Sequence, residues 1–310
     1  MKLMQPIHFY KRYVTFIDKV FISLTVFSLI FGGIIFFLNA ADFHYKMGAL
    51  FDTSITSFSA TQLICSISMS LFFLFYGMYI RNISPRSATF IWGMGAFYWV
   101  VLANMLVTNA VQATPFPPID AWLVKIDRDM GFSTAALMAW THNHPDLHHF
   151  FRTIYFSLGI ELILVPILLT VFCARKSLSV FYIAEMSTMI IGSTIYFFFP
   201  TMAPSGIIHS PYFSHMQDDT SIRFYQLHHF LTPTSYDGGL IAFPSFHVIW
   251  AILLTYACRA KKIFLYPMAI YNFILIITTV FLGWHYLTDV IAGIILAAAG
   301  IIFAEWVYSR

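Results

Sequence analysis

Charged residues are scarce in this sequence, and their scarcity excludes most soluble folds. Only 10% of the 310 residues are Asp, Glu, Lys or Arg, whereas 59% are hydrophobic. A soluble domain carries about 25% charged residues, because its surface faces water. The chain therefore has too little polar side chain to cover a water-exposed surface, and most of it must face lipid.

Cysteine is rarer still, and the sequence contains three: Cys65, Cys173 and Cys258. All three fall within apolar runs or at the ends of such runs, and their spacing is not that of metal ligands. We therefore expect no disulfide and no cysteine-based metal site.

Long apolar runs are abundant. A transmembrane helix needs about 20 mostly apolar residues, and by that criterion the sequence predicts an all-α membrane protein, a multi-pass bundle of about eight transmembrane helices. The sixth run is the shortest. The predicted spans are roughly 16–38, 60–80, 88–111, 152–173, 179–199, 244–260, 263–283 and 285–307.

The distribution of basic residues predicts how the bundle is oriented. If the spans alternate in direction, twelve of the seventeen lysines and arginines lie on the side of the N-terminus and five on the other side. Basic residues favour the cytoplasmic side, so we expect a plasma (inner) membrane protein with a cytoplasmic N-terminus. The net charge of +3 then reflects membrane topology, and we expect no nucleic-acid partner.

Two outer segments interrupt the apolar pattern and divide the chain. After the N-terminal transmembrane helices (1–112), residues 113–151 form an outer interfacial segment with an amphipathic stretch at 121–128 and a short apolar helix at 133–141. A catalytic transmembrane core (152–310) follows. Within this core, residues 200–243 are rich in Pro, His, Ser and Asp, and they are too many for a plain connection. We expect this loop to cap a site.

Two histidines near the starts of predicted helices are the main functional signal. His285 and Asp289 have the i, i+4 spacing that brings side chains together on a helix. A carboxylate bonded to one imidazole nitrogen fixes the tautomer and leaves the other nitrogen available as a nucleophile. The alternative is a polar pair that satisfies itself near the interface, but ionisable groups close to lipid are costly and usually functional.

The second histidine, His247, lies one helical hairpin away and is predicted on the same outer face. Pro244 is expected in the first turn of a helix, with Ser245 and free backbone N–H groups forming an anion site. His247 could then donate a proton to a leaving oxygen. Alone, a histidine at a helix start is usually idle; with His285 and Asp289 it completes a constellation for phosphoryl chemistry.

At these residues the chain resembles the type 2 phosphatidic acid phosphatase superfamily, which shares its site with vanadium haloperoxidases. Residues 244–247 resemble the second family motif and residues 285–289 the third. Residues 242–247, 285–286 and the proline-rich 199–204 most resemble the inositol phosphorylceramide synthase (inositolphosphotransferase) branch. The resemblance covers about residues 150–307 and implies a six-helix phosphatase-like core.

The resemblance implies roles for individual residues. His285 is expected to attack phosphorus and form a phosphohistidine, Asp289 to hold His285, and His247 to protonate the departing oxygen. Ser245 is expected to hold phosphate oxygens. A phospholipid or another lipid phosphate is the implied substrate, with water or an alcohol as acceptor, and no metal or cofactor is needed.

The sequence departs from the family pattern at its basic residues. Nothing matches the first motif with its Lys and Arg-Pro, Thr279 stands where the family has an Arg, and Phe246 stands where Gly is usual. Other groups must meet the phosphate charge. Arg223 in the capping loop is the best candidate by location; the alternative is that it is a solvated loop charge.

Two further groups of residues carry competing interpretations. The alternative function is a non-catalytic lipid transporter or binding protein on the same fold, and Glu161 and Glu185 within the predicted spans suit it. We expect, however, that these two carboxyl groups bond each other across adjacent helices and have a structural role. Four histidines at 142–149 suggest a metal site, but no tetrahedral ligand set is visible, and an interfacial turn is favoured.

Overall fold

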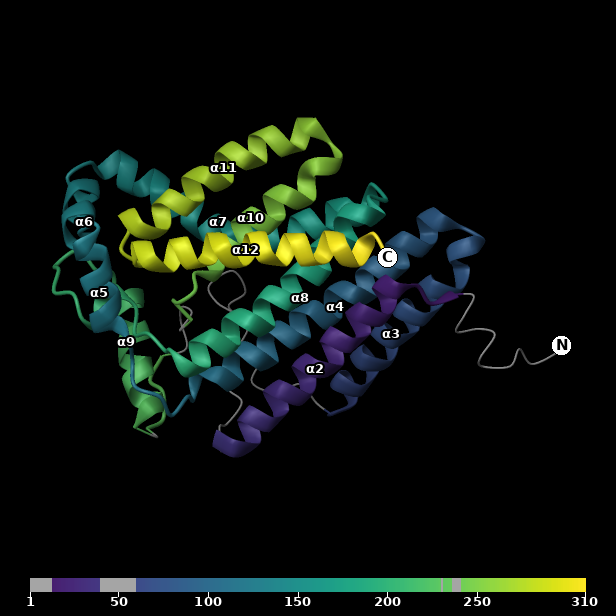
Figure 1. The fold of residues 1–310 in the computed structure, drawn as a ribbon, viewed down its shortest axis with the longest axis horizontal. Coiled ribbons are helices and arrows are strands. Elements are labelled where there is room, and N and C mark those ends of the chain that lie inside the picture. Colours follow the sequence, from purple (N-terminus) through teal and green to yellow (C-terminus); the bar gives the residue numbers. More distant parts are fainter. Residues whose placement is uncertain (1–12, 40–59, 230, 236–240) are drawn as a thin grey trace.

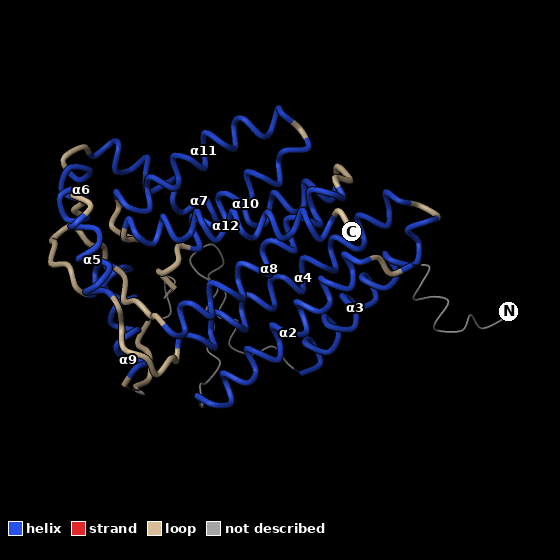
Figure 2. Tube along the Cα trace, in the orientation of Figure 1, coloured by secondary structure: helices blue, strands red, loops and turns tan. Residues whose placement is uncertain are grey.

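The computed structural model describes residues 13–39, 60–229, 231–235 and 241–310. Parts of the predicted N-terminal segment (1–12 and 40–59) and of the predicted capping loop (230 and 236–240) lie outside this description. Within the described residues every regular element is a helix (Figures 1 and 2). The elements are α2 (Phe16–Asn39), α3 (Ala60–Tyr79), η1 (Ile80–Asn82), α4 (Pro85–Gln112), α5 (Asp120–Asp129), α6 (Thr134–His142), α7 (Pro145–Val171), α8 (Arg175–Phe198), η2 (Pro204–Gly206), α9 (His215–His228), α10 (Phe246–Ala257), η3 (Cys258–Ala260), α11 (Lys262–Phe281) and α12 (Leu287–Tyr308).

The prediction of an all-α, multi-pass membrane protein is confirmed. Seven described helices, α2, α3, α4, α7, α8, α11 and α12, are long and apolar enough to cross a membrane. The remaining predicted span, the sixth (244–260), is α10, which has only 12 residues and continues as η3 to Ala260. The start of α2 and the end of α12 lie at the same end of the bundle, where the rings of Phe16 and Trp306 are 6.3 Å apart. An even number of passes is needed for this arrangement, so α10 and η3 complete the eighth pass.

Because α10 is short, its first residues lie below the end of the helical bundle. Twelve residues at about 1.5 Å each give roughly 18 Å of α-helix, well below the roughly 30 Å of a bilayer core. Because η3 reaches the same end of the bundle as the end of α12, the missing length is at the start of α10. His247, the second residue of α10, is therefore recessed into the bundle.

Two glycines allow the start of α10 to approach its neighbours. A Cβ on Gly293 of α12 would lie 2.8 Å from the carbonyl oxygen of Ser245, so α10 and α12 meet backbone to backbone. On α8, a Cβ on Gly192 would lie 2.8 Å from the ring of Phe246. The bulky Phe246, which replaces the usual family glycine, is thus accommodated by a glycine on the facing helix.

The outer segments gather at one end of the bundle, where α5, α6 and α9 lie together (Figure 1). The expected amphipathic stretch is α5 and the expected short apolar helix is α6. Helix α9, within the loop 200–243, was not expected. At its start Gln217 Oε1 accepts from the backbone N–H and the hydroxyl of Ser214, both at 2.9 Å. A serine followed three residues later by a glutamine is a sequence signature that could have revealed this helix.

The opposite end of the bundle is tied by ion pairs. Arg81 donates to both oxygens of the buried Asp18, at 2.6 and 2.9 Å. Arg259 and Lys176 bind Glu305 at 2.6 and 3.0 Å. These contacts join the ends of α2, α3, α8, α10 and α12.

The expectation that Glu161 and Glu185 pair with each other is wrong. Glu185 on α8 accepts hydrogen bonds from Asn104 Nδ2 at 2.8 Å and Trp250 Nε1 at 2.9 Å. Glu161 on α7 has Ser157 as its neighbour, at 3.5 Å. Each carboxyl group thus has its own polar neighbours, and the sequence spacing does not reveal which residues these are.

Candidate active site

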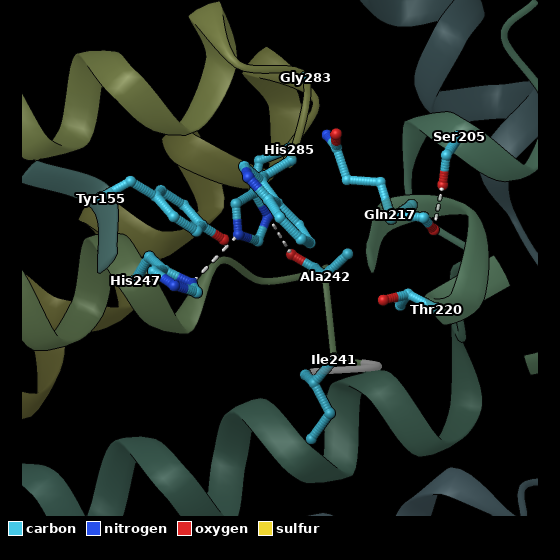
Figure 3. A pocket seen from close by; sticks show the side chains of 11 residues that line it. Tyr155, Ser205, Gln217, Thr220, Ile241, Ala242, His247, Gly283 and His285 are labelled. Atoms are coloured by element: carbon cyan, nitrogen blue, oxygen red, sulfur yellow. Dashed lines mark hydrogen bonds between the residues drawn. The ribbon is translucent and has the colours of Figure 1, made fainter. Parts of the chain in front are cut away.

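The structure brings the two predicted histidines together at the end of the bundle that holds α5, α6 and α9. His285 lies in the turn between α11 and α12, and His247 in the first turn of α10. Their rings face each other across 3.5 Å between His285 Nε2 and His247 Nδ1 (Figure 3). This juxtaposition joins residues 38 positions apart and forms the centre of the candidate site.

The neighbours of His285 fix its tautomer. Its Nδ1 lies 3.1 Å from the carbonyl oxygen of Ala242 and 3.3 Å from Asp289 Oδ2. Both are acceptors, so Nδ1 carries the proton and Nε2 keeps its lone pair. Nε2 is the nitrogen that faces His247, and its free lone pair could act as a nucleophile.

The Asp289 carboxylate has two hydrogen-bond partners. Its Oδ2 accepts from the backbone N–H of Tyr286 at 3.0 Å and also receives His285 Nδ1. The prediction that His285 and Asp289 meet is confirmed, but the expected reason is wrong. His285 precedes α12, whose N-cap is Tyr286, so the two side chains do not share a helix face; a turn of the backbone brings them together.

Burial governs the protonation of His285. The residue is 4% exposed, and burial lowers the pKa of its imidazole to about 4, against an opposing contribution from the Ala242 carbonyl. A buried imidazole loses the hydration that stabilises its cation. His285 is therefore neutral at physiological pH, as a nucleophile requires.

Aromatic side chains hold His247 in place. The ring of Tyr155 on α7 stacks on His247 with centroids 4.4 Å apart and on Trp284 at 5.2 Å. Stacking on one face leaves the edge of His247 directed at His285. Neither Tyr155, in helix α7, nor Trp284, in the turn before α12, was predicted as a site residue, because an aromatic residue in an apolar sequence gives no signal that separates it from ordinary packing.

A pocket with about 410 Å³ of free space, part of it open to solvent, adjoins the two histidines. Its polar lining outside the histidines is neutral, and no lysine or arginine is among the described residues that line it. The lining comprises Tyr155, Ala203, Ser205, Gln217, Thr220, Ile241, Ala242, His247, Gly283, Trp284 and His285. Six of these belong to the segment 200–243, which therefore covers the histidines.

A family model for the PAP2 superfamily matches residues 121–303, which extend from α5 into α12 and include both histidines and Asp289. The chain belongs to the PAP2 superfamily. Neither curated proteins nor solved structures give a match. The PAP2 match begins earlier than the region of motif resemblance, and it includes the interfacial helices α5 and α6.

The PAP2 motif residue Ser245 has a structural partner in this chain. It caps α10, where its hydroxyl accepts from Val248 N at 3.4 Å, and its own N–H donates to the Asp289 carbonyl at 3.1 Å. The expectation that Pro244 lies in the first helical turn is wrong, because α10 begins at Phe246. Serine is a preferred N-cap, so the helix starts after Ser245 and Pro244 remains outside.

The basic residues expected to serve PAP2 chemistry do not line the pocket. Arg223 is on α9, one turn after the pocket residue Thr220, and it is 4% exposed, so it is not the solvated loop charge of the alternative interpretation. Thr279, which stands where the family has an arginine, is buried. Its backbone carbonyl accepts from the N–H groups of Trp284 and His285 at 3.0 and 3.1 Å.

Two buried carboxylates on α5 were not predicted from the sequence. Asp120 and Asp127 are on the inner face of α5 and are buried, whereas Trp122 is exposed. Asp120 bonds Tyr286, and Asp127 bonds the first backbone groups of α12. Burial raises the pKa of Asp120 to about 7, although its hydrogen bonds from Met202 N and Tyr286 oppose the shift.

The histidine group at 142–149 is arranged for interfacial packing. His142 stacks near Tyr212 at 4.6 Å, and His144 Nδ1 lies 2.8 Å from the Trp140 carbonyl oxygen. Among the described residues, no three His, Cys, Asp or Glu side chains converge on one point. His142 and His144 instead join aromatic and backbone groups at the edge of α6.

Proposed function

We propose that this PAP2 superfamily protein is a membrane-embedded lipid phosphatase or phosphotransferase that acts through a phosphohistidine on His285. The observation that carries the proposal is the convergence of His285, Asp289 and His247 at a pocket. The three supply a neutral nucleophile, its orienting carboxylate and a proton donor.

The first half-reaction follows from these positions. His285 Nε2 attacks phosphorus, so an N–P bond forms while the P–O bond to the leaving group breaks. The departing oxygen takes a proton from His247, because the negative charge of the bound phosphate favours the protonated imidazole. The positive charge that develops on His285 is stabilised by Asp289. The 3.5 Å contact between the histidines is replaced by the phosphoryl group.

The second half-reaction returns the enzyme to its starting state. A hydroxyl group attacks the phosphohistidine, the N–P bond breaks, and His247 accepts the proton of the attacking hydroxyl. Water as acceptor gives a phosphatase, and an alcohol gives a transferase.

The neutral lining of the pocket favours a phosphodiester substrate. A phosphomonoester brings close to two negative charges at neutral pH, whereas a phosphodiester brings one. Burying charge without a counter-charge is costly, and the described pocket residues include no lysine or arginine. We therefore infer transfer of a phosphodiester headgroup to an alcohol, as in the inositol phosphorylceramide synthase branch that the motifs resemble.

The remaining expected features complete the proposal. Arg223 is retained as a candidate phosphate ligand because Thr220, one turn earlier on α9, lines the pocket. Ser245 contributes by capping α10 next to the phosphate position. Since most basic residues lie at the opposite end of the bundle, the site faces the extracytoplasmic side of the plasma membrane.

The test is a turnover assay with purified protein in mixed lipid vesicles. Labelled phosphatidylinositol with ceramide, phosphatidic acid and a prenyl diphosphate are supplied separately to wild type and to His285→Ala. We expect a new labelled lipid from phosphatidylinositol and ceramide, absent in His285→Ala.

The other outcomes separate the alternatives. Free phosphate from phosphatidic acid, lost in His285→Ala, identifies a phosphatase and overturns the transfer step. Turnover that survives in His285→Ala overturns the mechanism. Saturable binding of these lipids without turnover supports the non-catalytic transporter or binding protein.

A further inference from the structure

Helix α5 lies outside the membrane bundle, yet two of its carboxylates reach the start of α12. Asp127 Oδ2 accepts from Leu287 N at 2.8 Å, and its Oδ1 accepts from the backbone N–H and the hydroxyl of Thr288 at 3.0 and 2.6 Å. Asp120 Oδ1 accepts from the hydroxyl of Tyr286 at 2.9 Å. All three bonded residues follow His285 directly in the sequence.

These contacts do the work that a local cap normally does. The first N–H groups of a helix have no acceptor within the helix, and the residue before the helix usually supplies one. Here Tyr286 is the N-cap of α12 and makes no such side-chain bond. Asp127, 160 positions earlier, accepts from Leu287 instead.

The position of Asp127 at the start of α12 also stabilises its negative charge. The N-terminus of a helix carries a partial positive charge that stabilises nearby anions. Asp127 is 3% exposed and makes three hydrogen bonds with Leu287 and Thr288. The first turn of α12 is thus bound from outside, by a helix that the catalytic histidines do not touch.

We propose that Asp127 and Asp120 are positioning residues through which α5 holds the turn of His285 and the first turn of α12 in the reactive arrangement. The inference rests on the proposed function, because Asp127 and Asp120 take no part in the chemistry themselves and would act only through the positions of His285 and Asp289. If the link loosens, the distance from His285 Nε2 to the phosphoryl position changes, whereas the pocket that binds the lipid keeps its lining.

The test compares Asp127→Ala with a charge-matched control on the same helix, Asp129→Ala. Asp129 is exposed and lies in the last turn of α5. The readouts are hydrogen–deuterium exchange of residues 286–289 and the kcat and KM for transfer from phosphatidylinositol to ceramide. We expect Asp127→Ala to accelerate exchange at Leu287 and Thr288 and to lower kcat about ten-fold or more, because small misplacements of reacting groups are costly. KM should stay within about two-fold.

Conservative variants separate positioning from loss of fold. Asp127→Asn keeps the volume and one oxygen acceptor, so we expect it to restore part of the kcat lost in Asp127→Ala. Tyr286→Phe keeps the ring and removes the hydroxyl that Asp120 accepts. It should lower kcat by a few fold with KM unchanged. If Asp127→Ala fails to insert into the membrane, Tyr286→Phe still tests whether the contacts of α5 position the turn of His285.

Several results overturn the inference. One is exchange at Leu287 and Thr288 that is no faster in Asp127→Ala than in Asp129→Ala. Another is a wild-type kcat in Asp127→Ala while His285→Ala is inactive, which leaves the proposed function intact. Activity in His285→Ala, in contrast, removes the proposed function on which the inference rests.

Discussion

The two ends of the helical bundle bind their carboxylates in opposite ways. At the end where α2 begins and α12 ends, Asp18 and Glu305 are each bound by guanidinium or ammonium groups. At the other end, Asp120, Asp127 and Asp289 accept from backbone amides, hydroxyls and an imidazole. One end neutralises its charges, and the other uses them as hydrogen-bond acceptors that orient neighbouring groups.

This difference indicates which end carries the chemistry. An ion pair between two buried side chains satisfies both members and leaves nothing reactive. A carboxylate that bonds an imidazole and the first turn of a helix fixes geometry while His285 Nε2 keeps its lone pair. We therefore expect function to depend on the end whose carboxylates bind amides, hydroxyls and an imidazole.

The largest effect is expected from Asp289→Asn. The substitution keeps the size of the side chain, but it removes the negative charge that stabilises the cationic His285 and allows the wrong tautomer. By analogy with carboxylate-to-amide changes in catalytic triads, kcat should fall by about 100-fold or more. The measurement is transfer turnover in vesicles. Glu305→Gln, which changes a carboxylate at the opposite end, should stay within about two-fold of wild type, and equal losses in both variants would contradict the division between the ends.

A smaller loss is expected from Gly293→Ala. The new Cβ would lie 2.8 Å from the Ser245 carbonyl oxygen, so the start of α10 must move and carry His247 away from His285. We expect kcat to fall about ten-fold, since misplacement of about 1 Å can cost up to about 100-fold. Gly300→Ala is the matched control: Gly300 lies on the same helix α12, away from the site, and its new Cβ would crowd the side chain of Thr188 on α8. Similar kcat values for the two variants would argue against a geometric role of this contact.

The pH dependence of the reaction gives a milder test. The nucleophile must be neutral, and burial holds the pKa of His285 at about 4, so on the acid side of the profile activity falls as the pH drops through that value. At pH 5 about 90% of such an imidazole is neutral, against about 3% for an ordinary histidine with a pKa of about 6.5. The measurement is the kcat/KM profile with a phosphodiester lipid, whose single charge is constant over this range. An acid limb centred near pH 6.5 would show that His285 is hydrated.

The smallest effect on activity is expected from Arg81→Ala, at the end opposite the site. Removing one partner of a buried ion pair leaves Asp18 uncompensated and typically costs about 3–5 kcal/mol of stability. We therefore expect a lower midpoint of thermal unfolding in detergent, with kcat per folded molecule within about two-fold of wild type. The control is Lys176→Ala, whose ammonium is half exposed and whose loss should change the midpoint little. A large kcat loss in Arg81→Ala would couple the two ends.

The sequence predicted the parts of the fold that follow from length and hydropathy. Apolar runs predicted the spans. The contact between His285 and Asp289 was also predicted, although a turn before α12, and not a shared helix face, brings the two side chains together. The sequence could not reveal that Asp120 and Asp127 turn inward, because the amphipathic pattern of α5 does not tell which face meets protein and which meets lipid or water. The stacking of Tyr155 on His247 and the pairing of Glu185 with Trp250 depend on tertiary packing between distant helices, which leaves no local pattern.

The most direct test of the central claim is to trap the covalent intermediate. Wild-type protein in vesicles is mixed with phosphatidylinositol labelled in the headgroup, without an alcohol acceptor, and is quenched in base, where phosphohistidine survives. We predict label on the peptide that contains His285, absent in His285→Ala and released on addition of ceramide. Label on His247, or none on any histidine during active turnover, would contradict the account.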